Sequence, residues 1–346
     1  MNLLLEIIKN LTRPDLAKPI NFKKKKNYLP NKLYNFGNRN YQKKFYIIKK
    51  NYAPNGLWSN VHFVLDHIQF AVRKKLIPVV DMKNYQTIYN EKRIINGTLN
   101  AWNYYFELKP NYNLNQVYAS SNVFFSKDKR LKKTLVFKDQ SLKNIFFKRI
   151  RIKNNILVKV KKLKEKIFSK NEKVMGVHVR GTLQKIIRNH TFPPTPKDML
   201  KIASKIFINE NCTKIFLVSE DLTYIELFKK KFKNKLILLS RPRSKPSIFG
   251  SHNKHFSIYN RKLHRYKFGE ETLIDTLLLS YTNVFLFTNS NVRSAAMSLA
   301  KKKQVRYEIK LDNNSNNIFI ARWLWYLKFF FPMLFGKINY KIIKYR

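Results

Sequence analysis

The chain has 346 residues, of which 44% are hydrophobic and 14% aromatic, and it carries 70 Lys and Arg against 20 Asp and Glu. This length suits two domains of ordinary size, and the apolar content excludes wholesale disorder. The formal charge of +50 favours an anionic partner, such as a phosphorylated substrate or an acidic membrane surface. The abundant Lys, Asn, Ile, Phe and Tyr also have AT-rich codons, and the lysines are scattered, so no specific nucleic acid is expected as a partner.

Cys212 is the only cysteine, so no disulfide can form within the chain, which favours a reducing compartment. The segment 1–16 is too short and too charged to be a secretory signal. No run of 18 uncharged apolar residues occurs, and a membrane-spanning helix is not expected. These features together predict a cytoplasmic protein.

Residues 1–44 are basic and rich in Asn, and we interpret them as a partly ordered arm. Residues 45–150 are predicted to form an N-terminal α/β domain. It would begin with a strand over 45–48, followed by a turn and a helix, and then by a strand over 76–80.

The helix of this first domain is predicted from apolar residues that recur at positions i, i+3, i+4 and i+7 over 61–72. Ser59 or Asn60 can cap it, and Gly56 lies in the turn before it. The free N–H groups at such a helix start can hold an anion. Residues 85–126 are weakly patterned and are expected to carry short helices and loops.

Residues 151–312 are predicted to form a C-terminal Rossmann-like domain. A basic amphipathic helix, with Ile156 and Val160 on its apolar stripe, leads into it. Short apolar runs then alternate with helical patterns and indicate strands over 174–179, 215–218, 236–239, 284–287 and 305–309. The helices between them are expected to begin at Pro196, after Asp221, after a polar loop over 241–269, and at Asn291. This alternation is typical of a doubly wound parallel sheet.

Polar side chains follow several of these strands. Arg180, Glu220, Asp221 and Ser290 would share the carboxyl edge of the sheet, with Asp275 on a helix beside it. An arginine there meets phosphate or carboxylate, and carboxylates accept hydrogen bonds from ribose or base, so the set suits a sugar nucleotide. The alternatives stay open: Arg180 can be a structural ion-pair partner, and Asp221 and Ser290 can be simple helix caps.

Several common chemistries lack their motifs. The eight glycines never form the dinucleotide fingerprint, a P-loop or the nucleophile elbow. The pairs His62 with His67 and His252 with His255 lack zinc-site spacing or partners, and no metal site is predicted. No Asp-x-Asp pair is present, so a bound diphosphate would be neutralised by fixed cations and helix N-termini.

Residues 313–346 form an aromatic and basic C-terminal tail. The segment 318–335 contains Trp323, Trp325 and Tyr326 together with Arg322 and Lys328. It can lie in a membrane interface, where aromatic and basic side chains are both stable, or it can be a helix packed on the domains.

Four short segments resemble the GDP-fucose-dependent fucosyltransferases, the superfamily of the α-1,6-, α-1,2- and protein O-fucosyltransferases and the Nod-factor enzyme. They are His178-Val179-Arg180-Gly181-Thr182, then 215–221 (IFLVSED), 273–280 (LIDTLLLS) and 287–293 (FTNSNVR). The segment 56–60 (GLWSN) resembles the donor-side loop of that family.

The resemblance implies a GT-B-like α/β fold, with two Rossmann-like domains and an active site in the cleft between them. Residues 45–150 would be the domain on the acceptor side, and residues 151–312 the domain that binds the nucleotide sugar. It implies inverting, metal-independent transfer of L-fucose from GDP-fucose, with no cofactor beyond that donor. Arg180 would be the catalytic residue, stabilising the leaving GDP at its β-phosphate. By motif position, the donor-binding residues would be His178, Asp275, Glu220, Asp221, Ser290, Gly56 and Asn60.

The sequence departs from the family pattern beside this arginine. Many members have a second arginine where Gly181 stands and an aspartate where Leu183 stands, and no acid lies between 181 and 197. An inverting transfer needs a base, and the candidates are His190, Asp66 and Glu107.

The expected partners are the nucleotide sugar and a glycan acceptor, which a lipid can carry. Synthesis of a surface polysaccharide or lipopolysaccharide at the bacterial inner membrane would suit a peripheral enzyme that contacts anionic lipid. Two alternatives stay open: a glycosyltransferase that uses another nucleotide sugar or is degenerate, and a non-catalytic basic protein that binds nucleic acid or an acidic polymer.

Overall fold

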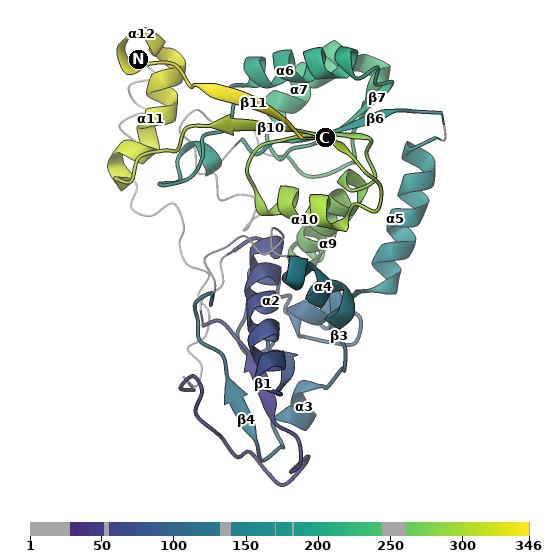
Figure 1. Ribbon diagram of the computed structural model, residues 1–346, viewed down its shortest axis with the longest axis vertical. Coiled ribbons are helices and arrows are strands. Elements are labelled where there is room, and N and C mark those ends of the chain that lie inside the picture. The colour runs from purple at the N-terminus through teal and green to yellow at the C-terminus, as the bar shows by residue number, and fades with distance from the viewer. Residues whose placement is uncertain are drawn as a thin grey trace. The chain divides into compact units, whose positions relative to one another are not determined.

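The computed structural model describes residues 28–51, 55–131, 140–169, 171–181, 183–243 and 261–345 (Figure 1). The predictions for residues 1–27, Thr182, His252 and His255 therefore lie outside the described residues. The chain divides into two compact units. Unit 1 comprises Met1–Lys18, Lys162–Asn260 and Asp275–Arg346, and unit 2 comprises Pro19–Lys161 and Arg261–Ile274.

Unit 2 is built on a small parallel sheet. Its strands are β1 (Phe45–Ile48), β2 (Ile77–Val80) and β4 (Val123–Phe125), in the order β2-β1-β4. Helix α2 (Leu57–Arg73) connects β1 to β2, as predicted. The remaining elements are η1 (Ala101–Tyr104), β3 (Phe106–Leu108), α3 (Leu114–Val117), α4 (Gln140–Arg149), β5 (Ile150–Ile152) and α5 (Asn154–Ile167). Strands β3 and β5 pair antiparallel.

Aromatic side chains fill much of the core of unit 2. All four side chains of β1 are buried, because the strand is central in its sheet. Residues 28–44 contribute to this core, since Tyr28 stacks on Phe125 with 4.2 Å between ring centroids. Tyr34 and Phe36 pack against the same cluster.

Unit 1 contains the doubly wound sheet that the sequence predicts. Its strands are β6 (Val174–His178), β7 (Lys214–Val218), β8 (Leu236–Ile237), β9 (Val284–Phe287), β10 (Val305–Leu311) and β11 (Tyr340–Tyr345). They lie in the order β11-β10-β9-β6-β7-β8, so the chain runs outward from β6 in one direction and then returns to β9 on the other side. All neighbouring strands are parallel except β10 and β11.

Helices cover both faces of this sheet (Figure 1). On one face lie α6 (Pro196–Asn209) and α7 (Leu222–Phe232). On the other lie α10 (Asn291–Leu299) and the C-terminal end, from Asp275 on, of α9 (His264–Leu279). Met175 and Val177 of β6 are fully buried against the apolar side chains of α6 and α7. The short elements η3 (Leu183–Lys185) and η4 (Lys233–Lys235) complete this region.

The C-terminal tail is helical and folds onto unit 1. It forms α11 (Ile318–Phe330) and α12 (Pro332–Phe335), followed by β11. Trp325 and Tyr326 are buried with Phe192 and Ile338, so the prediction of a packed helix holds for one face of α11. In the described part of the chain, no helix is long and apolar enough to cross a membrane.

Two local predictions are wrong. Helix α2 begins after Gly56 with no side-chain cap, because Asn60 lies inside the helix and its amide donates to the carbonyl of Asn55. Helix α9 begins at His264 instead of after 269, since Tyr266 packs on Tyr105 and the Tyr105 hydroxyl donates to the Tyr266 carbonyl at 2.9 Å. These contacts within unit 2 hold a polar segment in a helix that its sequence pattern does not indicate.

Candidate functional site

The candidate site lies where the strand order of unit 1 reverses, between the neighbouring strands β6 and β9. Ligands of doubly wound sheets bind in the crevice outside the carboxyl ends of such strands. His178 is the last residue of β6, and Ser290 follows β9 as the N-cap of α10. Their side chains meet, with 3.3 Å between Ser290 Oγ and His178 Nδ1.

His178 is held as a neutral imidazole. Burial, with smaller contributions from the charges of Arg180 and Arg293, lowers the pKa of His178 to about 3. Ser290 Oγ accepts the backbone N–H of Arg293 at 3.0 Å, so the serine hydroxyl proton is available to donate to His178 Nδ1. In that arrangement the proton of the ring resides on Nε2, which can donate to a ligand oxygen.

Arg180 follows β6 directly and is partly exposed. Among the described residues it has no hydrogen-bond or ion-pair partner. The neighbouring cations are engaged: Arg293 pairs with Glu308 at 2.7 Å and Arg241 with Asp275 at 3.1 Å. The alternative that Arg180 is a structural arginine paired with a carboxylate therefore finds no support in the described residues, and its guanidinium is available to an anion.

Asp221 has a structural role at this edge. Its Oδ1 accepts the backbone N–H of Thr223 at 2.9 Å and caps α7, as the sequence allowed. Its Oδ2 lies 3.3 Å from Lys185 Nζ, and both side chains are buried. Ser290 is also a helix cap, so the capping interpretation is confirmed for both residues, and Ser290 alone adds a contact to His178.

Gly181 is a glycine because the space beside it is full. A Cβ placed on it would lie 2.2 Å from Asp221 Oδ2 and 2.6 Å from Tyr224 Cε2. The backbone N–H of Gly181 donates to Glu220 Oε1 at 3.3 Å, so the Glu220 carboxylate contacts the residue that directly follows Arg180 in the sequence. The buried Lys185–Asp221 pair therefore explains why no larger residue stands at position 181.

Sequence reasoning missed three cations at this edge. The sequence pattern places Arg241 and Arg243 in a polar loop. In the structure, Arg241 binds Asp275. Arg243 donates to the carbonyls of Ser219 and Leu239 at 2.7 and 3.0 Å. Lys185 was not singled out. A signal was present, because the pair Arg241 and Arg243 follows a predicted strand at the same sheet edge as Arg180.

Helix α9 begins in unit 2 and ends in unit 1, and Asp275 is its first residue that belongs to unit 1. Its carboxylate accepts a hydrogen bond from Arg241 Nη2. The lone acid in an apolar run is thus balanced by an arginine from the loop after β8, and it is not left as an unpaired buried charge.

The other candidates belong to unit 2. Gly56 precedes α2, while Asn60 is buried within that helix. Asp66 is buried and forms a two-bond pair with Arg130, at 2.7 and 3.3 Å. Glu107 binds Lys153 and Arg151, whose hydrogen bonds lower the pKa of the Glu107 carboxyl and make it a weaker base.

His190 lies in unit 1, in the segment between η3 and α6. Partial burial, and then the charge of Arg180, lower the pKa of His190 below its ordinary value. Its imidazole is therefore neutral near pH 7 and able to accept a proton. Within the described ranges, no group of three or more His, Cys, Asp or Glu side chains is arranged to hold a metal ion.

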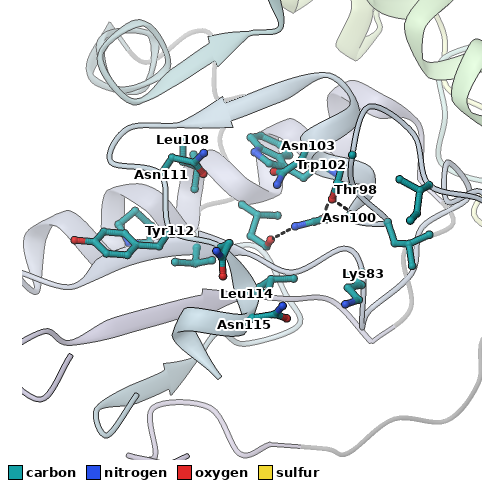
Figure 2. A pocket seen from close by; sticks show the side chains of 17 residues that line it. Lys83, Thr98, Asn100, Trp102, Asn103, Leu108, Asn111, Tyr112, Leu114 and Asn115 are labelled. Carbon is teal, nitrogen blue, oxygen red and sulfur yellow. Dashed lines mark hydrogen bonds between the residues drawn. The ribbon is translucent and has the colours of Figure 1, made fainter. Parts of the chain in front are cut away.

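Unit 2 contains a separate pocket of about 320 Å³ (Figure 2). It is lined by residues of β2, by the segment 94–103 and by residues 108–115. Asn100 is built into its wall, since its amide donates to the Val80 carbonyl at 2.7 Å and accepts from the Met82 N–H at 3.0 Å. Most of the remaining lining side chains are amides, aromatic rings and aliphatic groups.

Comparison of the sequence with protein-family models and with curated proteins finds no match. Solved structures do match. The NodZ α-1,6-fucosyltransferase soaked with GDP-fucose is 13% identical, with 88% of this chain and 100% of that chain covered and a TM-score of 0.52. The selenomethionine form of the NodZ fucosyltransferase from Bradyrhizobium is also 13% identical, with the same coverage of 88% and 100% and a TM-score of 0.51. The chain therefore has the α/β fold of the NodZ fucosyltransferases, which confirms at the level of the fold the resemblance seen in the sequence.

Proposed function

We propose that this protein is a glycosyltransferase that moves L-fucose from GDP-fucose to a glycan acceptor. The proposal is supported by the shared fold with NodZ, a fucosyltransferase whose structure was obtained with GDP-fucose. It is carried by one observation: Arg180 stands at the reversal point of the sheet with no partner among the described residues.

The diphosphate of the donor gains negative charge on its leaving oxygen as the glycosidic bond breaks. A guanidinium fixed beside that oxygen stabilises the transition state more than the ground state. Arg180 follows a fully buried strand, so its position is set by a rigid element. At the same edge, the His178 Nε2–H can donate a further hydrogen bond, and the N-terminus of α10 contributes a positive electrostatic potential.

Fixed cations of the chain make the transfer metal-independent in this proposal. Inversion at the sugar carbon requires the acceptor hydroxyl to attack opposite the diphosphate and to lose its proton to a base. Of the three candidates, we favour His190, because its lowered pKa keeps the ring neutral near pH 7. Asp66 is bound by Arg130, and Glu107 is bound by Arg151 and Lys153, so both carboxylates are already engaged in ion pairs.

The donor assignment is tested with the purified chain and a panel of nucleotide sugars. GDP and GDP-fucose should raise the melting temperature, and calorimetry should give a dissociation constant for GDP. Arg180→Ala should weaken GDP binding and lower the rate of fucosyl transfer by about 10²–10³-fold, the range typical of losing one preorganised charge donor. Arg180→Lys should recover only part of the loss, because a lysine lacks the planar fork.

Arg73→Ala is the matched control. It removes the same charge from an exposed site at the end of α2 in unit 2. Its GDP affinity should equal that of the wild type. If Arg180→Ala transfers fucose at the wild-type rate, the mechanism is wrong. If UDP- or CMP-sugars stabilise the chain while GDP does not, the second candidate function, transfer from another nucleotide sugar, replaces the first.

The acceptor and the cellular setting complete the proposal. The acceptor in this proposal is a glycan that grows on a lipid carrier at the inner membrane of a bacterium, for a surface polysaccharide or lipopolysaccharide. Such an acceptor would suit a cytoplasmic enzyme whose positive charge attracts anions. The net charge of +50 supports contact with acidic lipid.

A further inference from the structure

The pocket of unit 2 differs in chemistry from the rest of this cationic chain. Of the 17 residues that line it, Lys83 alone carries a charge at neutral pH, although the chain has 70 Lys and Arg. The lining instead offers side-chain amides, a phenol and an indole (Figure 2). Its volume of about 320 Å³ reaches the lower end of small-ligand pockets.

Three amides of the pocket are available to a ligand. The side-chain amides of Asn103, Asn111 and Asn115 have no hydrogen-bond partner among the described residues. Asn111 and Asn115 are exposed and Asn103 is half-buried, so their amides can bond to a ligand that enters the pocket.

Free amides combined with apolar and aromatic walls match a sugar. Each amide both donates and accepts, as sugar hydroxyls do, and the walls formed by Leu108 and Tyr112 suit the C–H faces of a pyranose ring. We propose that this pocket binds one unit of a neutral saccharide. The inference stands on the pocket itself and does not depend on the identity of the nucleotide donor.

Saturation-transfer NMR with neutral tetrasaccharides of glucose, mannose and N-acetylglucosamine tests the inference. At least one should show transfer from the protein that is unchanged between 0.1 and 0.5 M NaCl, since neutral contacts are not screened. The double variant Asn111→Ala/Asn115→Ala should weaken this binding at least tenfold. Both residues are exposed and lie outside the capping of α3, so the fold should be retained.

The matched control is Gln42→Ala/Gln86→Ala, which removes two exposed amides of unit 2 that do not line the pocket. Arg180→Ala should keep saccharide binding even where GDP binding is lost, so the two proposals fail separately. Equal saccharide binding by wild type and the pocket variant would overturn the inference. Displacement of the saccharide by guanosine or adenosine would also overturn it, because the pocket would then belong to a nucleoside.

A second feature, on unit 1, carries an independent inference. The face of α11 and α12 opposite the buried Trp325 exposes large apolar side chains. Phe319 is 72% exposed, Met333 93% and Leu334 79%. The apolar surface, as we name it, comprises Ile318, Phe319, Ile320, Phe330, Phe331, Met333, Leu334 and Phe335.

The helix that bears the apolar surface is firmly held on its other side. Trp325 Nε1 donates to the carbonyl of Pro193 at 3.0 Å, and Trp325 lies in an apolar cluster with Phe192 and Ile338. Figure 1 shows α11 and α12 next to each other at one end of unit 1. The apolar surface is thus fixed in place and turned away from the core. Apolar patches of this kind mark sites of interaction with proteins or membranes.

Charge identifies the occupant. From 313 to 345 the sequence contains no Asp or Glu, while Arg322, Lys328, Lys337 and Lys341 accompany the aromatic rings. A second copy of a chain with net charge +50 would be repelled. We infer that the apolar surface docks on an anionic lipid bilayer, with its rings at the interface and its cations among the headgroups.

Vesicle sedimentation tests this inference. Wild-type protein should bind vesicles of phosphatidylcholine with 30% phosphatidylglycerol, and 0.5 M NaCl should weaken that binding only in part. The variant Phe319→Ser/Met333→Ser/Leu334→Ser should partition at least a hundredfold more weakly, with an unchanged melting temperature because all three side chains are exposed.

Ile208→Ser/Leu29→Ser is the matched control, since these residues are 70% and 58% exposed outside the apolar surface. It should bind vesicles as the wild type does. Equal partition of the triple variant and the wild type would overturn the inference, as would binding that disappears for both in 0.5 M NaCl, which would show charge attraction alone.

Discussion

Ser290 Oγ lies 3.3 Å from His178 Nδ1, although 112 residues separate them in the chain. The contact forms because β6 and β9 are neighbours in the sheet while β7, β8 and α9 intervene in the sequence. It fixes the orientation of the buried imidazole beside Arg180. A neutral ring keeps an N–H donor at Nε2 without adding a charge that would repel the arginine.

The first prediction concerns Gly181. Gly181→Ala should lower the free energy of unfolding by about 1–3 kcal/mol, because the new methyl group overpacks a full site. The displaced neighbours are Asp221 Oδ2 and Tyr224 Cε2, at 2.2 and 2.6 Å from the added Cβ. Urea unfolding followed by circular dichroism measures the change.

Gly56→Ala serves as the comparison for Gly181. The backbone there has φ −62° and ψ 162°, which alanine can adopt, and the nearest atom to an added Cβ is 4.0 Å away. We expect a loss of less than about 1 kcal/mol from the weaker N-cap. A loss as large as that of Gly181→Ala would contradict the packing explanation.

The second prediction concerns the buried pair of Lys185 and Asp221, whose side chains are 5% and 0% exposed. Lys185→Met should cost about 3–5 kcal/mol of unfolding free energy, since it leaves a carboxylate buried without its cation. The double variant Lys185→Met/Asp221→Asn should recover part of that loss, because the asparagine can still cap α7. A double-mutant cycle of urea unfolding reads the coupling, and additive losses would rule it out.

The third prediction concerns Arg293, which joins two parts of unit 1. Its guanidinium donates to Glu308 Oε1 at 2.7 Å and to Asn289 Oδ1 at 3.0 Å, next to Ser290. Arg293→Lys cannot keep both bonds, so the loop after β9 should loosen. We expect about a tenfold rise in the dissociation constant for GDP, measured by calorimetry, which corresponds to about 1.4 kcal/mol.

Tyr345→Phe separates stability from binding in this network. The Tyr345 hydroxyl donates to Glu308 Oε2 at 2.6 Å, on the side away from Asn289. Its loss should lower stability by about 1.5–3 kcal/mol, as for a hydrogen bond to a charged group, while GDP affinity stays the same. A parallel fall in affinity would show that Arg293 acts through stability alone.

The fourth prediction concerns acid stability and His67. Burial lowers the pKa of the His67 imidazole to about 4. The ring lies between the Tyr46 hydroxyl at 2.9 Å and the Lys129 carbonyl at 3.2 Å, so Nε2 carries the proton and Nδ1 accepts. Between pH 6.5 and 4 the unfolded chain therefore binds the extra proton. The free energy of unfolding should therefore decrease as the pH is lowered from 6.5 to 4, by up to about 1.4 kcal/mol per pH unit.

His67→Gln should remove one proton from that dependence and leave the contribution of His178 in place. Unfolding at pH 7, 6, 5 and 4.5 gives the slopes, and NMR titration of the imidazole protons gives the pKa directly. The prediction is wrong if the variant and the wild type lose stability equally between pH 6.5 and 4.

The alternation of strands and helices in unit 1 could be predicted from the sequence because it depends on local patterns. The runs 174–177 and 284–287 contain no polar side chain, since parallel strands are covered on both faces. Pro196 and Asp221 mark helix starts through backbone chemistry that acts within one turn. From these patterns the placement of Arg180 and Ser290 at one sheet edge followed.

Contacts between distant segments could not be predicted in this way. The polar start of α9 is helical because Tyr105, far earlier in the chain, packs on Tyr266. The antiparallel strand β11 exists because β10 offers it an edge, and its own sequence, YKIIKY, has no alternation of apolar and polar residues that would indicate a strand. Arg241 could not be assigned to Asp275, since only the folded chain brings the loop after β8 to α9.

The sequence alone therefore determined the parallel strands β6 to β10, their order along the chain and the arginine that follows β6, because periodicity and capping are properties of neighbouring residues. The tertiary structure decided which groups are engaged: it pairs Lys185, Arg241 and Arg293 with carboxylates and leaves Arg180 without a partner among the described residues. Pairing depends on distances across the sheet, and no local pattern in the chain encodes those distances.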